Sequence, residues 1–203
     1  MPFFVAAFQD VHPDRLEETL TTIRGDLATS RRQHPGRRDT RVFQRINYPT
    51  HLLEIAEWDS LADYEQLRRT PRYQEMIARA DPPARIEHLN RLRLFARMSV
   101  TAAVAGCVTM NVPPENAQAL EAFILDDMRP GVEASVGLVT HEVYRMGAEV
   151  GRLLVVHSWR SIEDLERFRA GDRKRYDATL ASLGVTAERL TNVVAAELSA
   201  LDV

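Results

Sequence analysis

The 203-residue chain has little cysteine, almost no lysine and no long apolar segment. Its single cysteine, Cys107, cannot form a disulfide within the chain or a thiolate metal cluster, so stability has to come from a buried core. No apolar run approaches the ~20 residues that span a membrane, and the first residues lack the basic stretch of a signal peptide. We therefore expect a cytoplasmic protein with no membrane partner. The net charge is −3 although 25 of the 26 basic residues are arginine. This balance disfavours a nucleic-acid partner, because phosphate binding needs a net positive face.

The chain also lacks a Gly/Ser-rich linker, and it contains an internal repeat instead. An offset of 101 residues aligns the two halves without a gap and gives seventeen identical positions, seven of them between residues 52 and 68. The only two tryptophans, Trp58 and Trp159, coincide in this alignment. The self-similarity predicts a tandem duplication, with repeat 1 at residues 1–100 and repeat 2 at residues 101–203.

Each repeat shows the pattern strand, helix, strand, strand, helix, strand. The first helix begins at a proline followed by an acid, and the second begins at Ser-x-x-Asp, a capping-box pattern that starts at Ser60 and at Ser161. This order predicts an α+β fold of two ferredoxin-like (β-α-β-β-α-β) repeats, which would form an intramolecular dimeric α+β barrel. The strands are predicted at residues 3–9, 40–46, 51–58 and 91–98 of repeat 1 and at 104–110, 139–146, 152–159 and 192–198 of repeat 2.

Residues 52–60, Leu-Leu-Glu-Ile-Ala-Glu-Trp-Asp-Ser, join an apolar strand, a tryptophan and a serine-capped helix. In this motif and its repetition the chain resembles the antibiotic biosynthesis monooxygenase family of the dimeric α+β barrel superfamily, in a fused tandem form. The resemblance implies a cofactor-independent oxygenase that converts an anthrone-like or phenolic aromatic polyketide to a quinone, with that small substrate and O2 as its partners. Because fold does not decide chemistry, a polyketide cyclase or isomerase working without O2 and a non-catalytic ligand-binding barrel are the alternatives.

Side-chain parity places Leu52, Glu54, Ala56 and Trp58 on one face of a strand. In the quinone-forming members that the chain resembles, the site includes the tryptophan, a polar residue four positions earlier and a tyrosine six positions later. Trp58, Glu54 and Tyr64 have this spacing, although the family usually has asparagine where Glu54 stands. Trp58 or Tyr64 would donate a hydrogen bond to a developing oxyanion, and a desolvated Glu54 would accept the proton. The alternatives are packing roles for Trp58 and Tyr64 and a salt bridge from Glu54 to an arginine. Leu52 and Ala56 are expected to contact substrate.

Repeat 2 keeps Trp159 but has Val155 and Leu165 at the other two positions. Its candidate bases are His157, on the tryptophan face of the strand, and His141, on the preceding strand. A surface histidine or a hydrogen-bonded core histidine is the alternative for each. The sequence therefore places the better site in repeat 1.

Two groups of arginines are further candidates for ligand contacts. Arg91, Arg93 and Arg97 alternate along one predicted strand face, where Arg93 could hold an anionic substrate or pair with a glutamate. The basic segment 30–38 is predicted to be a loop that is solvated, gates a cavity or meets an acidic carrier protein.

No spacing of His, Cys, Asp or Glu suggests a metal site. Arg68 and Arg169 stand where haem-degrading relatives carry a histidine, so we expect neither metal nor cofactor. A monomer with pseudo-twofold symmetry or a homodimer is expected.

Overall fold

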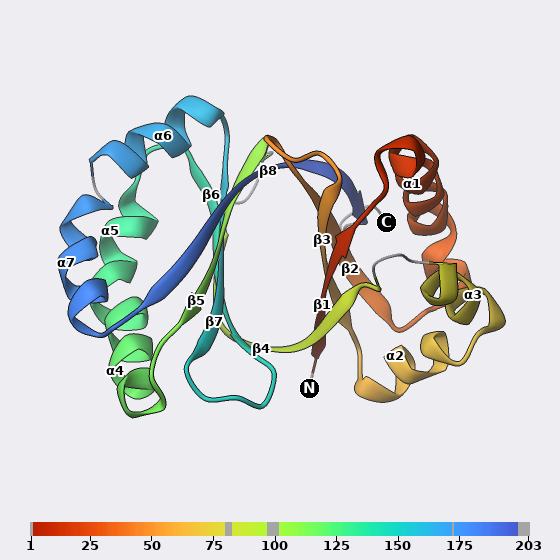
Figure 1. The fold of residues 1–203 in the computed structure, drawn as a ribbon, viewed down its shortest axis with the longest axis horizontal. Coiled ribbons are helices and arrows are strands. Elements are labelled where there is room, and N and C mark those ends of the chain that lie inside the picture. Colours follow the sequence, from red (N-terminus) through yellow and green to blue (C-terminus); the bar gives the residue numbers. More distant parts are fainter. Residues whose placement is uncertain (1, 80–82, 97–101, 172, 199–203) are drawn as a thin grey trace. The chain divides into compact units, whose positions relative to one another are not determined.

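A computed structural model describes residues 2–79, 83–96, 102–171 and 173–198 (Figure 1). The chain divides into two compact units: unit 1 comprises Met1–Leu89 and Val193–Val203, and unit 2 comprises Asn90–Asn192. Among the described residues, no helix has the length and apolar character needed to cross a membrane.

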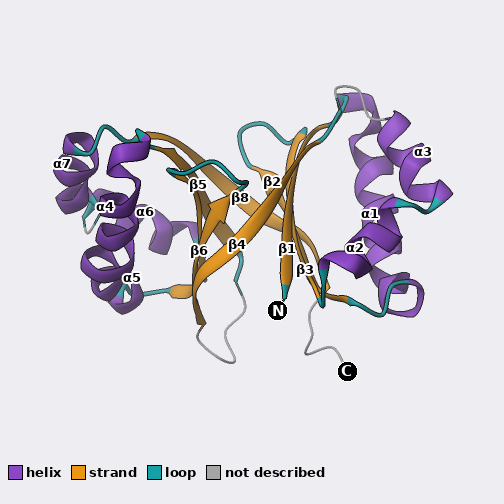
Figure 2. Ribbon diagram, turned by 90° about the horizontal axis from the view of Figure 1, so that it is seen from below, coloured by secondary structure: helices purple, strands orange, loops and turns teal. Residues whose placement is uncertain are grey.

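Unit 1 is built on an antiparallel sheet in the order β4-β1-β3-β2. Its helices cover one face of that sheet (Figure 2). The elements are β1 (Phe3–Asp10), a 3₁₀ turn (Pro13–Arg15), α1 (Leu16–Gln33), β2 (Arg37–Arg45), β3 (His51–Trp58), α2 (Leu61–Arg68), α3 (Pro71–Arg79) and β4 (Arg85–Ala96), which continues into unit 2.

Unit 2 repeats this arrangement with the strand order β8-β5-β7-β6. Its first helix differs from that of unit 1, because a π-helical segment (Phe123–Met128) joins its two α-helical parts. The elements are β5 (Val104–Asn111), a 3₁₀ turn (Pro114–Asn116), α4 (Ala117–Ala122), the π-helical segment, α5 (Arg129–Ala134), β6 (Leu138–Met146), β7 (Arg152–Trp159), α6 (Ile162–Ala170), α7 (Lys174–Ser182) and β8 (Thr186–Leu198), which continues into unit 1.

The predicted α+β class with two ferredoxin-like repeats is confirmed by these strand orders. Both predicted N-caps are present: the hydroxyl oxygen of Ser60 accepts the Asp63 N–H at 3.3 Å, and that of Ser161 accepts the Asp164 N–H at 3.2 Å. Glycine precedes β2 and β6 because the capping acid packs there. A Cβ atom on Gly36 would lie 2.5 Å from Cγ of Asp63, which excludes any larger residue.

Three local predictions were wrong. The second helix of each repeat is two helices, because Pro71 cannot continue α2 and Gly171 ends α6. The last strands, β4 and β8, begin at Arg85 and Thr186, earlier than predicted. Polar and apolar side chains are mixed in their first residues, so no apolar run marks where these strands start. Segment 30–38 is mostly not a loop, since α1 continues to Gln33 and β2 begins at Arg37.

Candidate functional site

The strand-face residues predicted in repeat 1 all point toward the helices of unit 1. Leu52 packs in a buried cluster with Val11 and Leu20. Ala56 and Trp58 pack in a second buried cluster, with Val5 and Tyr64. These contacts follow from the register, which pairs Trp58 with Phe3 on β1 and with Arg37 on β2.

Glu54 is held in an ion pair. Its Oε1 accepts a hydrogen bond from Nη2 of Arg37 at 2.6 Å, and Nε of the same guanidinium donates to Oγ1 of Thr40 at 2.7 Å. The Arg37 side chain is 9% exposed and its guanidinium lies over the Trp58 ring, with Cζ 5.6 Å from the ring centroid. Glu54 therefore forms the salt bridge that the sequence offered as its alternative role. Because Arg37 holds the carboxylate, Glu54 is not free to act as the predicted base.

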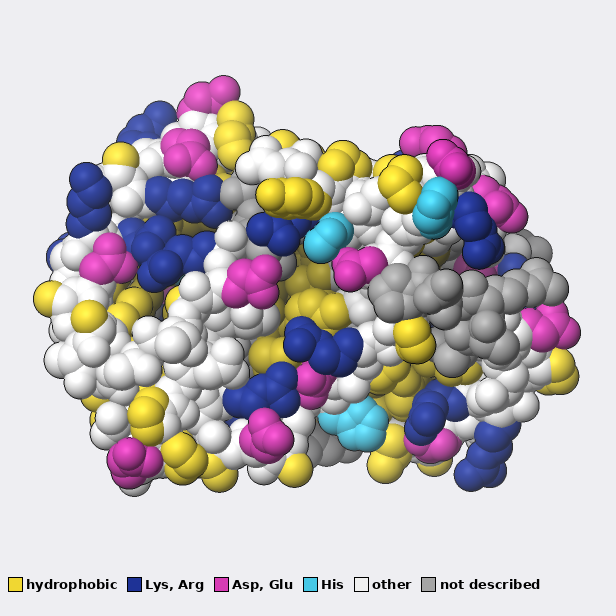
Figure 3. All heavy atoms as spheres, in the orientation of Figure 1, with side chains coloured by type: hydrophobic (Ala, Val, Ile, Leu, Met, Phe, Trp, Pro, Cys, Tyr) yellow, Lys and Arg dark blue, Asp and Glu magenta, His cyan; other side chains and the backbone are white. Residues whose placement is uncertain are grey.

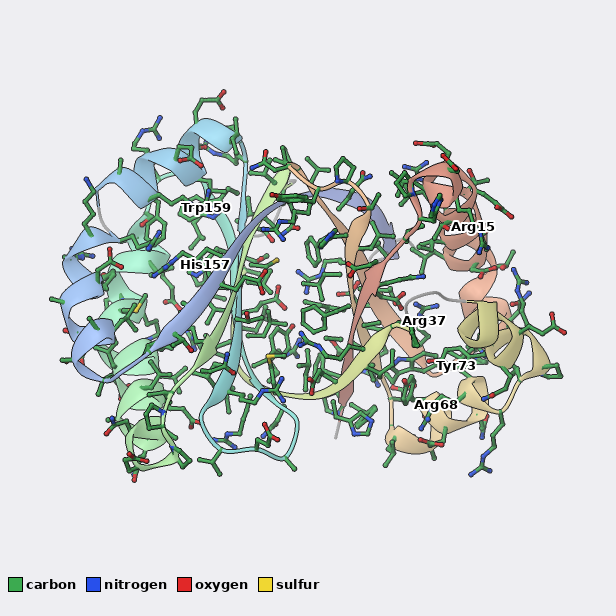
Figure 4. All side chains as sticks on the ribbon, viewed as in Figure 1. Arg15, Arg37, Arg68, Tyr73, His157 and Trp159 are labelled. Carbon is green, nitrogen blue, oxygen red and sulfur yellow. The ribbon has the colours of Figure 1, made fainter. Side chains whose placement is uncertain are left out.

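Tyr64 lies at the end of the same cluster. Its ring is 5.7 Å from Phe3 and 5.7 Å from Trp58, measured between centroids. Burial and the neighbouring Tyr73 hydroxyl raise the pKa of Tyr64 well above its usual value. The phenol therefore stays protonated and can act only as a hydrogen-bond donor or acceptor. Figure 4 shows Arg37, Arg68 and Tyr73 on this helix side of unit 1.

His157 and His141 are neighbours in unit 2. They face each other across β7 and β6, and their ring centroids are 4.8 Å apart. Both nitrogens of His141 and Nδ1 of His157 are buried without a hydrogen-bond partner among the described residues. Burial lowers the pKa of His141 to about 4, with Arg93 also lowering it and Glu133 and Glu142 opposing the shift. Burial, then His141 and Arg169, lower the pKa of His157 well below its usual value. Both imidazoles are thus neutral at pH 7, and neutral imidazole is the form that accepts a proton.

Trp159 continues the aromatic group around His157. Its ring is 5.1 Å from Phe168 and is stacked at 6.4 Å from the His157 ring, again between centroids. Its Nε1–H is buried without a hydrogen-bond acceptor in the described part of the chain, as is that of Trp58. A buried donor without a partner costs about 1–3 kcal/mol, which a ligand acceptor could offset. Figure 4 shows His157 and Trp159 between the strands and helices of unit 2.

A cavity of ≈ 40 Å³ lies beside His157, between the sheet and the helices of unit 2. This volume holds about three water molecules and is small beside the ~300–1,000 Å³ of typical ligand pockets. An aromatic ligand of two fused rings is larger than this volume, so it can enter only if lining side chains move. Two of these side chains are methionines, which are flexible. The apolar lining consists of Val108, Met110, Met128, Leu165, Phe168 and Leu180, and the remainder consists of Gly106, His157, Arg169, Arg173 and Arg189.

The two repeats differ at the positions that make this cavity. Gly106 faces the cavity, and a Cβ atom there would lie 3.3 Å from Cδ1 of Leu165. At the offset of 101, the position of Gly106 in repeat 1 is held by Val5 and that of Leu165 by Tyr64. Both larger side chains are packed in the buried cluster around Trp58. Repeat 2 thus has smaller residues at two cavity positions where repeat 1 has packed side chains.

The π-helical segment supplies Met128 to the cavity wall. Proline at position 130 lacks an N–H, so the regular hydrogen-bond ladder is interrupted at this point of the helix. The Tyr176 hydroxyl donates to the Met128 carbonyl at 3.3 Å. π-Helical turns occur often at functional sites, and the equivalent helix of unit 1, α1, has none.

The remaining predicted candidates are arginines, of which Arg93 lies near enough to His141 to lower its pKa. Arg93 is in unit 2, where Nη2 and Nε donate to Oε1 of Glu133 at 3.0 and 3.1 Å, as the glutamate alternative predicted. Arg97 lies outside the described residues. No group of three or more His, Cys, Asp or Glu side chains in the described ranges is arranged to hold a metal ion.

The structure thus brings together His141, His157 and Trp159 in unit 2, and Glu54, Trp58, Tyr64 and Ala56 in unit 1. Gly106 and the three arginines at the cavity were not predicted from the sequence to be site residues. A signal for two of them was present, because Arg169 and Arg173 are among the seventeen identical positions, matching Arg68 and Arg72.

Comparison with known proteins places this geometry in a family. The sequence model of the antibiotic biosynthesis monooxygenase family matches residues 2–79 and 103–175. No curated protein matches the chain significantly.

Solved structures of similar fold extend over nearly the whole chain. An anthrone oxidase-like protein is similar with a TM-score of 0.77 at 14% identity, covering 99% of this chain and 94% of its own. A proposed monooxygenase from Fusobacterium nucleatum gives 0.78 at 11% identity, covering 97% and 93%. One from Lactobacillus acidophilus gives 0.74 at 10%, covering 98% and 96%. At such identities these structures support the fold.

Proposed function

Because this chain belongs to the antibiotic biosynthesis monooxygenase family, we propose that it oxidises an anthrone-like or phenolic aromatic substrate with O2 to a quinone, without an added cofactor. The observation that carries the proposal is the cavity of repeat 2, where a neutral, buried histidine and three guanidinium groups line an otherwise apolar space. The anthrone oxidase-like structure of similar fold agrees with this substrate class.

The reaction requires little from the protein beyond deprotonation and charge stabilisation. Loss of a proton turns an anthrone into an electron-rich enolate, which can itself reduce O2. In the balanced reaction the methylene carbon loses two hydrogens and gains one oxygen as a carbonyl, and the second oxygen atom leaves as water. A base, a cation for the enolate oxygen and an apolar enclosure are therefore sufficient.

His157 is the base that we assign to this step. At neutral pH it is uncharged, and burial together with the nearby Arg169 disfavours its protonated form. A phenolate or enolate in the cavity reverses that balance, because an adjacent negative charge favours the imidazolium. Proton transfer is thus coupled to the presence of the substrate anion. Trp159 does not line the cavity, but its ring stacks on His157 and packs against Phe168, so we assign it the role of positioning these two residues.

Repeat 1 is less suited to the reaction than the sequence indicated. Glu54 is engaged in an ion pair with Arg37, and Val5 and Tyr64, the counterparts of two cavity residues, pack in the buried cluster around Trp58. We therefore place the reaction in repeat 2 and retain Trp58 and Tyr64 as hydrogen-bond donors of a second, weaker candidate site.

A cyclase or isomerase is the second candidate function. Every group assigned above also serves a proton transfer that does not involve O2, so the same cavity supports both reactions. A non-catalytic ligand-binding barrel would use the cavity without His157 as a base.

Oxygen uptake by the purified protein with anthrones and naphthols, without added cofactor, tests the proposal. We expect uptake with quinone formation in the wild type, and a loss of about 10²-fold or more in His157→Ala, which introduces the residue that repeat 1 has at this position (Ala56). Trp159→Phe is expected to lower the rate, whereas Trp58→Phe serves as the matched control in repeat 1. Substrate turnover without O2 consumption would establish the cyclase or isomerase instead. Equal losses in Trp58→Phe and Trp159→Phe would contradict the assignment to repeat 2.

A further inference from the structure

Three arginine side chains meet at the cavity of repeat 2, from different elements. Arg169 is on α6, Arg173 precedes α7, and Arg189 is on β8. Basic side chains gather on this face of unit 2, near α6 and β8, with apolar surface beside them (Figure 3). The cavity therefore combines an apolar floor with a cationic wall.

Among the described residues, Asp177 and Glu166 form ion pairs with these arginines. Oδ1 of Asp177 lies 3.3 Å from Nη2 of Arg173 and 3.6 Å from Nη2 of Arg189, so one carboxylate serves two guanidiniums. Arg169 pairs at 2.7 Å with Glu166, which is more than half exposed. Burial and the positive charges of Arg173 and Arg169 lower the pKa of Arg189, and Asp177 only partly opposes them. An additional anion would reduce the repulsion among the three cations.

Repeat 1 lacks this arrangement. Its equivalents of Arg169 and Arg173 are Arg68, which pairs with Glu65, and Arg72, which pairs with Asp26. The Arg72 side chain is 65% exposed, whereas that of Arg173 is 25% exposed. In place of Arg189 repeat 1 has His88, whose ring packs against Phe3 with centroids 5.1 Å apart. The third cation of repeat 2 thus has no counterpart at the equivalent position of repeat 1.

We propose that the cavity of repeat 2 binds an aromatic carboxylate, with the ring against His157 and Phe168 and the carboxylate on Arg173 and Arg189. The planar guanidinium fork binds a carboxylate through two parallel hydrogen bonds, and the apolar lining suits an aromatic ring. That this ligand is also the substrate rests on the proposed function, because the proposed oxidation acts on a ring that carries a hydroxyl group. The substrate is then a phenolic acid, held so that its hydroxyl group can reach His157.

Calorimetry under nitrogen measures the affinities of two probes, 1-hydroxy-2-naphthoate and 1-naphthol. It tests the inference because the two probes differ only in the carboxylate. We expect the wild type to bind the naphthoate at least about tenfold more tightly, and the preference to weaken with added salt. Arg173→Gln and Arg189→Gln should each remove most of the preference. Arg72→Gln, the matched variant in repeat 1, should leave it intact.

Equal affinity of the wild type for the two probes, absence of naphthoate binding, or the same loss in Arg72→Gln as in Arg173→Gln would overturn the inference. Oxygen uptake with both probes separates this result from the proposed function. Tight naphthoate binding without O2 consumption under air retains the anion site and argues against the oxygenase. Oxidation of 1-naphthol without any preference for the naphthoate retains the oxygenase and rejects the anion site.

Discussion

Removal of Glu54 should destabilise the protein because it leaves the Arg37 guanidinium buried without its carboxylate. The Arg37 side chain is 9% exposed, so water cannot replace the lost oxygen, whereas the Glu54 side chain is 33% exposed. Breaking a fully buried pair costs about 3–5 kcal/mol, and the partial exposure of Glu54 reduces this. A charge-assisted hydrogen bond contributes about 1.5–3 kcal/mol. We therefore expect Glu54→Val to lower the free energy of unfolding by about 2 kcal/mol.

The internal repeat supplies the control for this prediction. At the offset of 101, Leu138 and Val155 occupy the positions of Arg37 and Glu54, and both are fully buried. The double variant Arg37→Leu/Glu54→Val therefore introduces an apolar pair that the same fold already accommodates. Replacing a buried ion pair by apolar residues of similar volume is often neutral or stabilising. We expect the double variant to be more stable than Glu54→Val alone and within about 1 kcal/mol of the wild type.

Thermal denaturation followed by near-UV circular dichroism measures these differences. For a chain of this length 1 kcal/mol corresponds to about 2–4 °C in Tm, so Glu54→Val should melt roughly 4–8 °C below the wild type. Arg37→Leu completes the double-mutant cycle. An unchanged Tm in Glu54→Val, or a double variant at least as unstable as that single variant, would refute the reasoning.

Three further predictions concern repeat 2. The pKa of His141 is lowered from 6.5 to about 4, so the unfolded chain binds a proton between these values that the folded chain does not; this group alone should lower stability by about 2 kcal/mol from pH 7 to pH 5, and His157, whose pKa is also lowered, adds to the fall. His141→Thr, which introduces the residue of repeat 1 (Thr40), should reduce that loss, and an unchanged drop in Tm would contradict the assignment. Ser161→Ala should lower stability by about 1 kcal/mol through loss of the N-cap, measured by urea denaturation, with Ser161→Gly costing less. Gly106→Val should change stability by less than about 1 kcal/mol, since strand propensity offsets crowding against Leu165, yet abolish naphthoate binding in calorimetry.

Much of the fold followed from the sequence because the signals were local and occurred twice. Alternating strands and the serine caps recur in both repeats, and Trp58 and Trp159 end β3 and β7 as predicted. Strand starts with polar residues were missed, because at Arg85 and Thr186 pairing with neighbouring strands, rather than an apolar pattern, fixes the boundary.

The candidate site was less predictable because it depends on distances between elements. A salt bridge from Glu54 was foreseen, but its partner was not, since a β-bulge between Arg37 and Asp39 sets which side chain lies opposite Trp58. The difference between Val5 and Gly106 was visible in the aligned repeats. Its consequence required the position of Leu165 on a helix packed against that strand.

Because the two repeats are fused in one chain, equivalent positions can hold different residues, as Val5 and Gly106 do. In an assembly of identical one-repeat chains, a glycine that opens a cavity in one copy opens it in every copy, and each copy loses buried contacts. Here each half has its own sequence, so one half can have valine in a buried cluster while the other has glycine beside a cavity and a buried histidine. In the duplicated chain, substitutions that adapt the cavity of repeat 2 to a new ligand can therefore leave the buried cluster of repeat 1 unchanged.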